Sequence, residues 1–342
     1  THGGFITHLN RQAFEITTIH LGVKVDDATR ALQSASDHFL HWPDFNPKLV
    51  DAIGAMALDV IVYPDLGMEP LTQSLATLRL APVQCNAGGH PITSGLDTID
   101  YFLSSDLMEA EGAEAHYSEQ LVRLPQLFTA YPRPEVVEPE LPEILRDRSP
   151  TARLVCLQSL YKLLPQFDWV YAEILERIPG SELCFIAEAS ERVTDVFRRR
   201  VAGALEARGL SFEERVLVLP RMSQEAFYGL AGSATVVLDS FLWSGNNSSM
   251  EASWLGRPIV TWPGPMMRGR HTYAILRRMG LEALIAKDLP DYVDRVVRLV
   301  EDDAWRAEVE TAIAERRDTL FDDPEPVRAF EAFLLGLWGL NS

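Results

Sequence analysis

Short apolar runs alternate along the chain with longer stretches in which apolar residues recur every three or four positions. The short runs have the length of buried parallel strands, and the longer stretches have the period of crossover helices. In the first part of the chain the pattern predicts strands over 14–21, 60–63, 81–84, 101–104 and 120–124, and helices over 27–35, 48–57 and 70–78. The predicted fold class is therefore α/β.

A segment rich in proline and glutamate interrupts this alternation between residues 131 and 152. Because proline fixes φ and lacks an amide donor, such a segment cannot continue a helix or a central strand. The alternation then restarts, with strands predicted over 154–157, 182–186, 216–219, 235–238 and 259–261, and helices over 165–178, 191–207, 224–232, 249–255 and 271–278.

Two Rossmann-like, doubly wound domains follow from this pattern. We expect a first domain over 1–130, a linker over 131–152, a second domain over 153–325, and an apolar helix over 326–342 that returns to the first domain. In open parallel sheets, ligands bind beyond the carboxyl ends of the strands. The default ligand site is a cleft between two such edges facing each other.

The composition fits this interpretation and limits the classes of partner that we expect. The chain has 342 residues, 47% hydrophobic and 23% charged, which suits about two domains with sizeable cores. A net charge of −18 at pH 7 would repel the phosphates of nucleic acid, so nucleic acid is not an expected partner. No window approaches the run of about 20 apolar residues that a membrane span needs.

The cysteines and the amino terminus add two expectations. Cys85, Cys156 and Cys184 occur singly, without metal-ligand spacing, so we expect neither a structural metal nor a disulfide framework, and a cytoplasmic location. The first residues lead into Phe5 without a cap. We therefore expect an upstream segment, and the first strand of the first domain, to be absent from this chain.

The most informative loop follows the strand predicted over 235–238. A small polar turn with Gly245, Asn246, Asn247 and Ser248 leads into a helix whose first amides can bind a phosphate. Glu251, one turn further on, can accept hydrogen bonds from ribose hydroxyls. The alternative is that the two asparagines and the serine only cap the helix.

Two more loops of the second domain carry cations near predicted strand ends. Arg270 and His271, with Arg268 close by, can face an anionic donor or orient a sugar, although a surface turn is the alternative. Gln158, Ser159 and Lys162 follow the first strand of this domain. There the lysine can neutralise a diphosphate leaving group as its charge develops.

In the first domain, His90 lies in a glycine-rich stretch at a strand end, and Asp65 lies at an equivalent strand end. The ordinary pKa of histidine is about 6.5, so His90 can act as a general base. Asp65 is the weaker candidate, because Pro-Asp-x-Gly is also an ordinary turn sequence.

Taken together, these loops resemble the catalytic region of the O-GlcNAc transferase and SPINDLY-type family, including its bacterial members. The matching segments keep the family's order over about residues 55–290, and they are Arg79–Gln84, Gly89–Gly95, Asp100–Phe102, His116–Glu119, Leu160–Lys162, Leu238–Asp239 with Gly245, and Gly256–Gly264. Each segment alone is weak, but in this order they are fairly specific.

The resemblance implies a GT-B fold and a nucleotide-sugar donor, UDP-GlcNAc or a related UDP-sugar. It further implies metal-independent transfer with inversion at the anomeric carbon, no cofactor, and a protein Ser or Thr side chain as acceptor. Lys162 matches the family lysine at the donor diphosphate, and Glu251 matches the acidic ribose contact. Asn246, Asn247 and Ser248 stand where the family has His-Thr-Thr around the phosphates, and the nucleobase segment matches Arg221, Met222 and Gln224.

Several departures from the family leave the donor sugar and its base open. Asn246 replaces a histidine, Gln224 stands where a lysine would be, and Ser159 replaces a glutamine of the animal enzymes. The family histidine of the first strand-to-helix loop has no counterpart here. The family's helical repeats, which select protein acceptors, would lie upstream of this chain, and the extra domain of the animal enzymes has no room between the two domains.

The leading hypothesis is an inverting protein glycosyltransferase in which Lys162 and the helix start after Gly245 stabilise the leaving group. His90 is the first choice of base and Asp65 the second, with water-mediated proton removal as a further alternative. Two other interpretations stay open: a glycosyltransferase acting on a glycan or small molecule, and a nucleotide-sugar-binding module without turnover.

Overall fold

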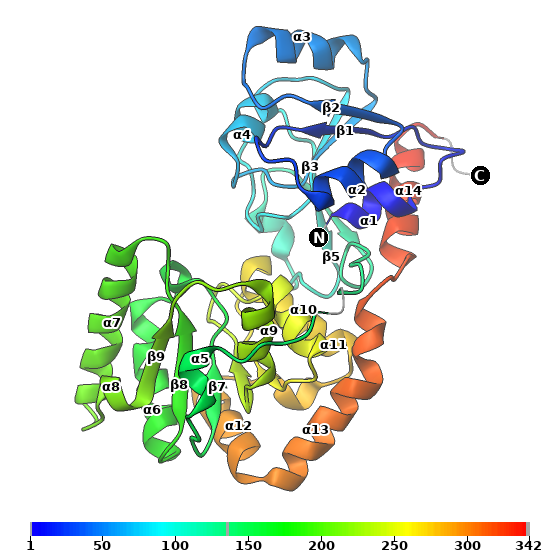
Figure 1. The fold of residues 1–342 in the computed structure, drawn as a ribbon. Helices are drawn as coiled ribbons and strands as arrows, with labels where there is room; N and C mark the ends of the chain where they lie inside the picture. Colours follow the sequence, from blue (N-terminus) through cyan, green and yellow to red (C-terminus); the bar gives the residue numbers. More distant parts are fainter. Residues whose placement is uncertain (1, 135–136, 340–342) are drawn as a thin grey trace. The chain divides into compact units, whose positions relative to one another are not determined.

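A computed structural model of the chain describes residues 2–134 and 137–339. Residue 1, residues 135 and 136 of the predicted linker, and the last three residues of the predicted C-terminal helix lie outside the described part. The chain divides into two compact units (Figure 1). The first runs to Arg133 and includes the segment from Phe321 onward, and the second is Pro134–Leu320.

The first unit contains two parallel sheets. Four strands are ordered β3-β4-β5-β6, and β1 pairs separately with β2. The strands are β1 (Thr17–His20), β2 (His38–His41), β3 (Val60–Tyr63), β4 (Val83–Asn86), β5 (Tyr101–Ser105) and β6 (Gln120–Leu124). The helices are α1 (Gly3–His8), α2 (Asp27–Ala35), α3 (Pro47–Ala55), α4 (Pro70–Ala76), η1 (Ala113–His116) and α14 (Glu325–Leu337).

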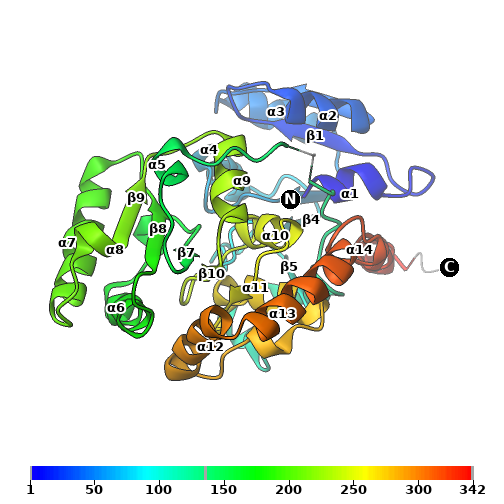
Figure 2. The ribbon, with the colours of Figure 1, turned by 60° about the horizontal axis from the view of Figure 1, so that its bottom comes forward.

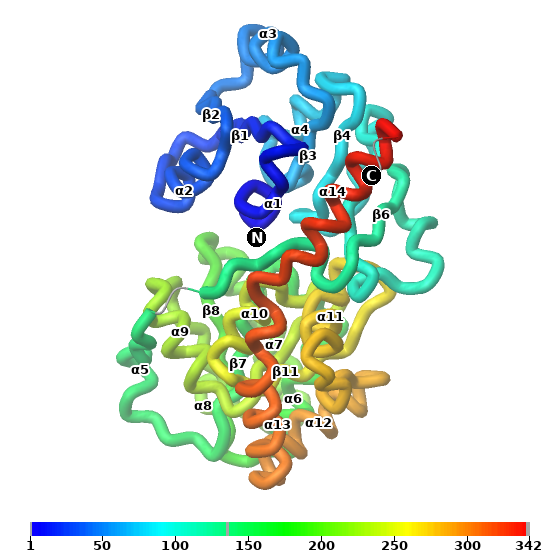
Figure 3. Tube along the Cα trace, turned by 90° about the vertical axis from the view of Figure 1, so that its right-hand side faces the viewer, coloured from blue at the N-terminus to red at the C-terminus, as the bar shows by residue number. Residues whose placement is uncertain are grey.

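Local sequence explains where the helices of this unit begin. Asp26 and Thr29 form a capping box at α2, and the Asn46 side chain caps α3 ahead of a proline in its first turn. α14 contacts α1 and β6 within the same unit, as the red segment of Figure 3 shows. The short strand β2 was absent from the sequence expectation, because its four residues alternate too briefly to give a signal.

The second unit is one five-stranded parallel sheet in the order β11-β10-β7-β8-β9. Its strands are β7 (Arg153–Val155), β8 (Glu182–Ile186), β9 (Val216–Leu219), β10 (Val236–Leu238) and β11 (Ile259–Val260). Its helices are α5 (Glu143–Arg146), η2 (Leu160–Lys162), η3 (Pro165–Phe167), α6 (Asp168–Arg177), α7 (Glu191–Glu206), α8 (Phe212–Arg215), α9 (Gln224–Gly232), α10 (Asn247–Trp254), η4 (Met267–Gly269), α11 (His271–Arg278), η5 (Glu282–Leu284), α12 (Leu289–Glu301), α13 (Asp303–Arg316) and η6 (Arg317–Leu320).

Helices cover both faces of this sheet. α6 packs against α7 on one face, and α9 packs against α10 on the other (Figure 2). The buried core between sheet and helices includes Val155, Cys184, Leu219, Val237 and Ile259. This is the doubly wound arrangement that the hydrophobic pattern predicts.

Part of the segment expected as a linker packs against the second unit instead. It forms the short helix α5, and Leu145 of that helix is 1% exposed and belongs to the core. A Cβ atom on Gly229 of α9 would lie 2.1 Å from the carbonyl oxygen of Glu140, so the two backbones are in close contact. The difference arises because Leu141 and Leu145 add apolar surface to an otherwise proline-rich stretch.

Among the residues that the structure describes, no helix is both long and apolar enough to cross a membrane. The three cysteines are buried free thiols.

Candidate functional site

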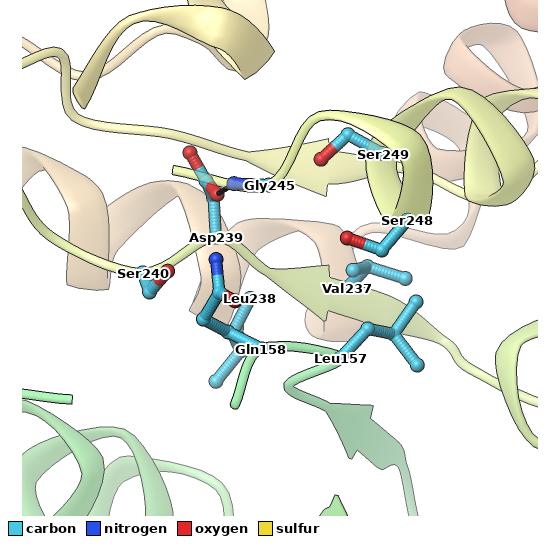
Figure 4. A pocket seen from close by; sticks show the side chains of 9 residues that line it. All are labelled: Leu157, Gln158, Val237, Leu238, Asp239, Ser240, Gly245, Ser248 and Ser249. Carbon is cyan, nitrogen blue, oxygen red and sulfur yellow. Dashed lines mark hydrogen bonds between the residues drawn. The ribbon is translucent and has the colours of Figure 1, made fainter. Parts of the chain in front are cut away.

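The strand order of the second unit fixes where its ligand site should lie. The chain passes from β7 to β8 and β9 in one direction, and then β10 pairs with the other side of β7. In doubly wound sheets, ligands bind at this switch point, beyond the carboxyl ends of the two strands. A small pocket is found there (Figure 4), lined by Leu157, Gln158, Val237, Leu238, Asp239, Ser240, Gly245, Ser248 and Ser249.

Asp239, directly after β10, organises the turn that leads to α10. Its carboxylate accepts hydrogen bonds from the Gly245 amide at 2.8 Å and from the Thr261 hydroxyl at 2.6 Å. Burial raises the pKa of Asp239 to about 6, although these hydrogen bonds oppose the shift. The Thr272 hydroxyl also donates to the carbonyl of Gly245 at 3.0 Å, so the turn is held from both sides.

The start of α10 presents small polar groups to the pocket. A Cβ atom at Gly245 would lie 2.5 Å from the Ser249 hydroxyl and 2.8 Å from that of Ser248, so a side chain at this position would displace both hydroxyls. No side chain caps the helix at Asn246. The half-buried Ser248 side chain lines the pocket, as Figure 4 shows. These groups are suited to binding phosphate oxygens.

Lys162 ends the 3₁₀ turn η2 that follows β7. Its side chain is half-buried, and desolvation lowers the pKa of its ammonium group, while the charge of Glu188 acts in the opposite direction. The Glu188 carboxylate also accepts a hydrogen bond from the Leu160 amide at 2.8 Å, which fixes the start of the turn. Gln158 donates to the carbonyl of Trp243 at 3.1 Å and thereby joins this loop to the Gly245 turn.

The loop after β11 supplies Arg270 and His271. The Arg270 guanidinium donates to the Gly264 carbonyl at 3.2 Å and stacks on the Tyr273 ring at 4.3 Å. His271 is 4% exposed, and its Nδ1 has no hydrogen-bond partner among the described residues. Burial lowers the pKa of His271 to about 4, and the nearby Lys162 charge adds to this effect, so the imidazole is neutral at pH 7.

The predicted ribose and nucleobase contacts lie on α9 and α10. Burial raises the pKa of Glu251, which hydrogen bonds with Tyr228, and Gln224 donates to the same Tyr228 hydroxyl at 3.4 Å. Tyr228 therefore brings Glu251 and Gln224 together. Arg221 is exposed in the loop after β9, and Met222 beside it packs against the core.

The first unit brings its two candidate bases into neighbouring loops. Gly67, two residues after Asp65, has a φ of +97°, and a Cβ there would lie 2.7 Å from the His90 ring. A Cβ at Gly89 would lie 1.8 Å from the Pro64 carbonyl, so the two loops touch at the backbone. Both side chains are half-buried, and desolvation raises the pKa of Asp65.

Sequence reasoning did not include Tyr228, Trp243 or Thr272 among the candidate site residues. Tyr228 and Thr272 are buried on helices, where local sequence gives no signal of a polar contact. Trp243 carried one possible signal, since a tryptophan just ahead of Ser-Gly in a loop after a strand is unusual for a solvated turn. In the described part of the chain, no group of three or more His, Cys, Asp or Glu side chains is placed to hold a metal ion.

Comparison with protein families and curated proteins gives consistent results. The model of glycosyl transferase family 41 matches residues 150–325. A probable UDP-N-acetylglucosamine–peptide N-acetylglucosaminyltransferase SPINDLY from Solanum lycopersicum is 30% identical over 297 residues, which are 85% of this chain and 31% of that protein. A UDP-glucose:protein N-beta-glucosyltransferase from Actinobacillus pleuropneumoniae is 26% identical, over 86% of this chain and 46% of that protein.

The chain thus spans between about a third and a half of the length of these relatives. Among solved structures, a lysine-to-methionine mutant of the Thermobaculum terrenum O-GlcNAc transferase superposes with a TM-score of 0.86 at 25% identity, over 98% of this chain and 64% of that one. The trehalose-6-phosphate synthase OtsA gives a TM-score of 0.57 at 14% identity, over 85% of this chain and 75% of that one, a likeness of fold alone. The expected α/β class of GT-B type is confirmed.

Proposed function

The chain belongs to glycosyl transferase family 41, and from this premise we propose that it transfers a sugar from a nucleoside diphosphate donor to a protein. The donor is UDP-GlcNAc or a related UDP-sugar, and the acceptor is a Ser or Thr hydroxyl. The proposal includes inversion at the anomeric carbon and no requirement for a metal ion.

One observation carries this proposal: Gly245 and Ser248 line the pocket at the switch point, and the ammonium of Lys162 lies 5.3 Å from the ring of Trp243, two residues before Gly245. In the reaction, the acceptor oxygen attacks the anomeric carbon while the bond to the diphosphate oxygen breaks. Both electrons of that bond leave with the diphosphate, and the acceptor proton passes to a base. The ammonium of Lys162 and the amides at the start of α10 offset the charge that develops on the leaving group.

Each unit has a separate part in the proposal. The second unit binds the donor, with Glu251 at the ribose and the segment of Arg221, Met222 and Gln224 at the nucleobase. The first unit presents the acceptor, with His90 as first choice of base and Asp65 as second.

The proposed identity of the donor sugar is based on the relatives of this chain. Two kinds of curated relative are described as using UDP-N-acetylglucosamine and UDP-glucose. The departures from the family at Asn246, Ser159 and Gln224 lie around the expected donor, so both sugars belong in the test.

The decisive experiment is a donor and acceptor screen read by mass spectrometry. The chain is incubated with UDP-GlcNAc, UDP-glucose and other nucleotide sugars, together with a peptide library and a set of glycans, in the presence of EDTA. A mass increase on a Ser or Thr residue supports the proposal, and the configuration of the new bond tests inversion. Loss of transfer in EDTA that Mg²⁺ restores would contradict metal independence.

The same screen separates the alternatives. Transfer to a glycan or small molecule alone would favour the second enzymatic interpretation. Binding of a nucleoside diphosphate without transfer or donor hydrolysis would favour a binding module. The cytoplasmic location expected from the cysteine pattern stays a prediction, which the location of the tagged protein in fractionated cells would test.

A further inference from the structure

Trp243 lies beside two cations of the candidate site. The ammonium nitrogen of Lys162 is 5.3 Å from the centroid of the indole ring, and the guanidinium carbon of Arg268 is 5.7 Å from it. Both distances fall within the range of about 6 Å over which the negative face of an aromatic ring attracts a cation. Lys162 also lies 5.8 Å from the ring of Tyr161, which is 64% exposed.

The backbone around Trp243 is held in a conformation that costs free energy. Leu242, the preceding residue, has a φ of +63°, in the left-handed region that non-glycine residues seldom adopt. Gly264 and Gly269 of the next loop pack against it, since a Cβ on either glycine would lie 3.2–3.3 Å from an atom of Leu242. The surroundings therefore hold a strained residue directly before the indole.

Hydrogen bonds hold the backbone of Trp243 and join its turn to the two loops that carry the cations. Its carbonyl accepts from Ser240 Oγ at 2.6 Å and from Gln158 Nε2 at 3.1 Å, and Gln158 precedes the turn that carries Lys162. The amide of Ser244 donates to the carbonyl of Arg268 at 2.7 Å. Three loops, after β7, β10 and β11, thus meet around one aromatic ring.

We propose that Trp243 is a positioning residue that holds Lys162 and Arg268 on its ring, so that two cations are oriented toward the diphosphate of the donor before it binds. This inference rests on the proposed function for the identity of the ligand, but the contacts themselves do not. Two like charges held near each other repel, and an aromatic ring offsets part of that cost without neutralising either charge. A carboxylate in the same place would cancel the charge that the phosphates require.

A first experiment tests the contact without any ligand. The chain contains four lysines, Lys24, Lys48, Lys162 and Lys287, so reductive methylation with ¹³C gives few lysine signals, and Lys162→Arg assigns the one of interest. We expect the methyl signal of Lys162 to be shifted upfield by the ring current of the indole. Trp243→Leu should remove most of this shift, and Trp243→Phe and Trp243→Tyr should keep much of it.

A matched control is available elsewhere in the second unit. Arg298 lies 4.2 Å from the ring of Trp305, a cation–π pair that is no part of the candidate site. Trp305→Leu should leave the Lys162 signal unchanged. A Lys162 signal that stays in place when Trp243→Leu is made would overturn the inference.

A second experiment measures the affinity for UDP and GDP by calorimetry. With the nucleotide that binds wild type more tightly, Trp243→Leu should weaken binding by about tenfold, as expected for the loss of two partly exposed cation–π contacts. Trp243→Phe and Trp243→Tyr should restore most of the affinity. If Trp243 only filled space, the affinity of the variants would instead follow the volume of the side chain. Arg268→Gln should weaken binding in wild type and have little further effect in the Trp243→Leu background.

The outcomes separate the two proposals. If wild type binds neither nucleotide, the proposed function fails while the methyl signal still reports on the contact. If wild type binds and Trp243→Leu binds equally well, the inference is wrong and the proposed function stands. Should Trp243→Leu not fold, as judged by circular dichroism, Trp243→Met takes its place. Tighter nucleotide binding by Trp243→Phe and Trp243→Tyr than by Trp243→Met would then support the inference, and equal binding would overturn it.

Discussion

The amide of Gly245 donates a 2.8 Å hydrogen bond to Oδ1 of Asp239, so a buried carboxylate holds the glycine turn that opens α10. The other carboxylate oxygen accepts from the Thr261 hydroxyl at 2.6 Å. The negative charge of Asp239 is thus directed at the protein's own donors and is kept behind the turn. The turn can then present its remaining groups to an anion.

Replacing Asp239 by alanine should lower the free energy of unfolding by about 2–4 kcal/mol, because the Gly245 amide and the Thr261 hydroxyl both lose a charged acceptor. Chemical denaturation followed by circular dichroism measures this. Asp303→Ala is a suitable control, since the Asp303 side chain is 86% exposed in a surface ion pair with Arg306. A change below about 0.5 kcal/mol in Asp239→Ala, the size typical of surface substitutions, would contradict the organising role.

Asp239 should also leave a signature in the pH dependence of stability. Burial raises its pKa from the ordinary 3.8 to about 6, so between these values the folded state holds a proton that the unfolded state has released. Its stabilising contribution is therefore present below pH 3.8 and is lost as the pH rises through about 6, up to about 3 kcal/mol in all. We expect wild type to lose stability relative to Asp239→Asn over this window. The difference between the two proteins isolates Asp239, because His2 and His271 titrate in both.

Lys162→Ala should reduce kcat by about 10²- to 10³-fold with the fold intact, because one cation facing the leaving group is removed. Transfer kinetics with the best donor from the screen, together with a thermal melt, give both quantities. Lys287→Ala, an exposed lysine outside the candidate site, should behave like wild type. Wild-type turnover in Lys162→Ala would count heavily against the assignment.

Gly89→Ala should destabilise the first unit by about 2–3 kcal/mol or more, because the added methyl would meet the Pro64 carbonyl at 1.8 Å and push two loops apart. Gly54→Ala is the matched control. Gly54 lies in α3 with open space where its Cβ would stand, so this substitution should instead stabilise by about 0.5–1 kcal/mol through helix propensity. Urea denaturation of both variants gives the sign of each change in the free energy of unfolding. An unchanged free energy of unfolding in Gly89→Ala would show that the two loops separate at little cost.

The identity of the base can be read from pH–rate profiles. If His90 removes the acceptor proton, His90→Gln should lower kcat by about 10²- to 10⁴-fold and abolish the acid limb of the profile, with donor KM nearly unchanged. Asp65→Asn should have a smaller effect. The reverse order would make Asp65 the base, and full activity in both variants would point to water-mediated proton removal.

Much of the fold could be predicted from the sequence because it rests on local periodicity. The strands of the second unit fall close to their predicted ranges, and the small polar residues after β10 were enough to indicate the turn there. β2 and α5 were absent from the expectation, because four residues are too few for a hydrophobic period to stand out from the background.

The same distinction between local sequence and contacts of distant segments applies to the candidate site. The sequence by itself determined which loops follow strands and which of them carry a lysine, a glycine turn or a histidine, since these are properties of neighbouring residues. The tertiary structure alone decided that β10 pairs with β7, that Tyr228 joins Glu251 to Gln224, and that the ring of Trp243 lies close to both Lys162 and Arg268. These relationships depend on strand order and on packing between distant segments, and no local pattern of polar and apolar residues encodes which segments meet.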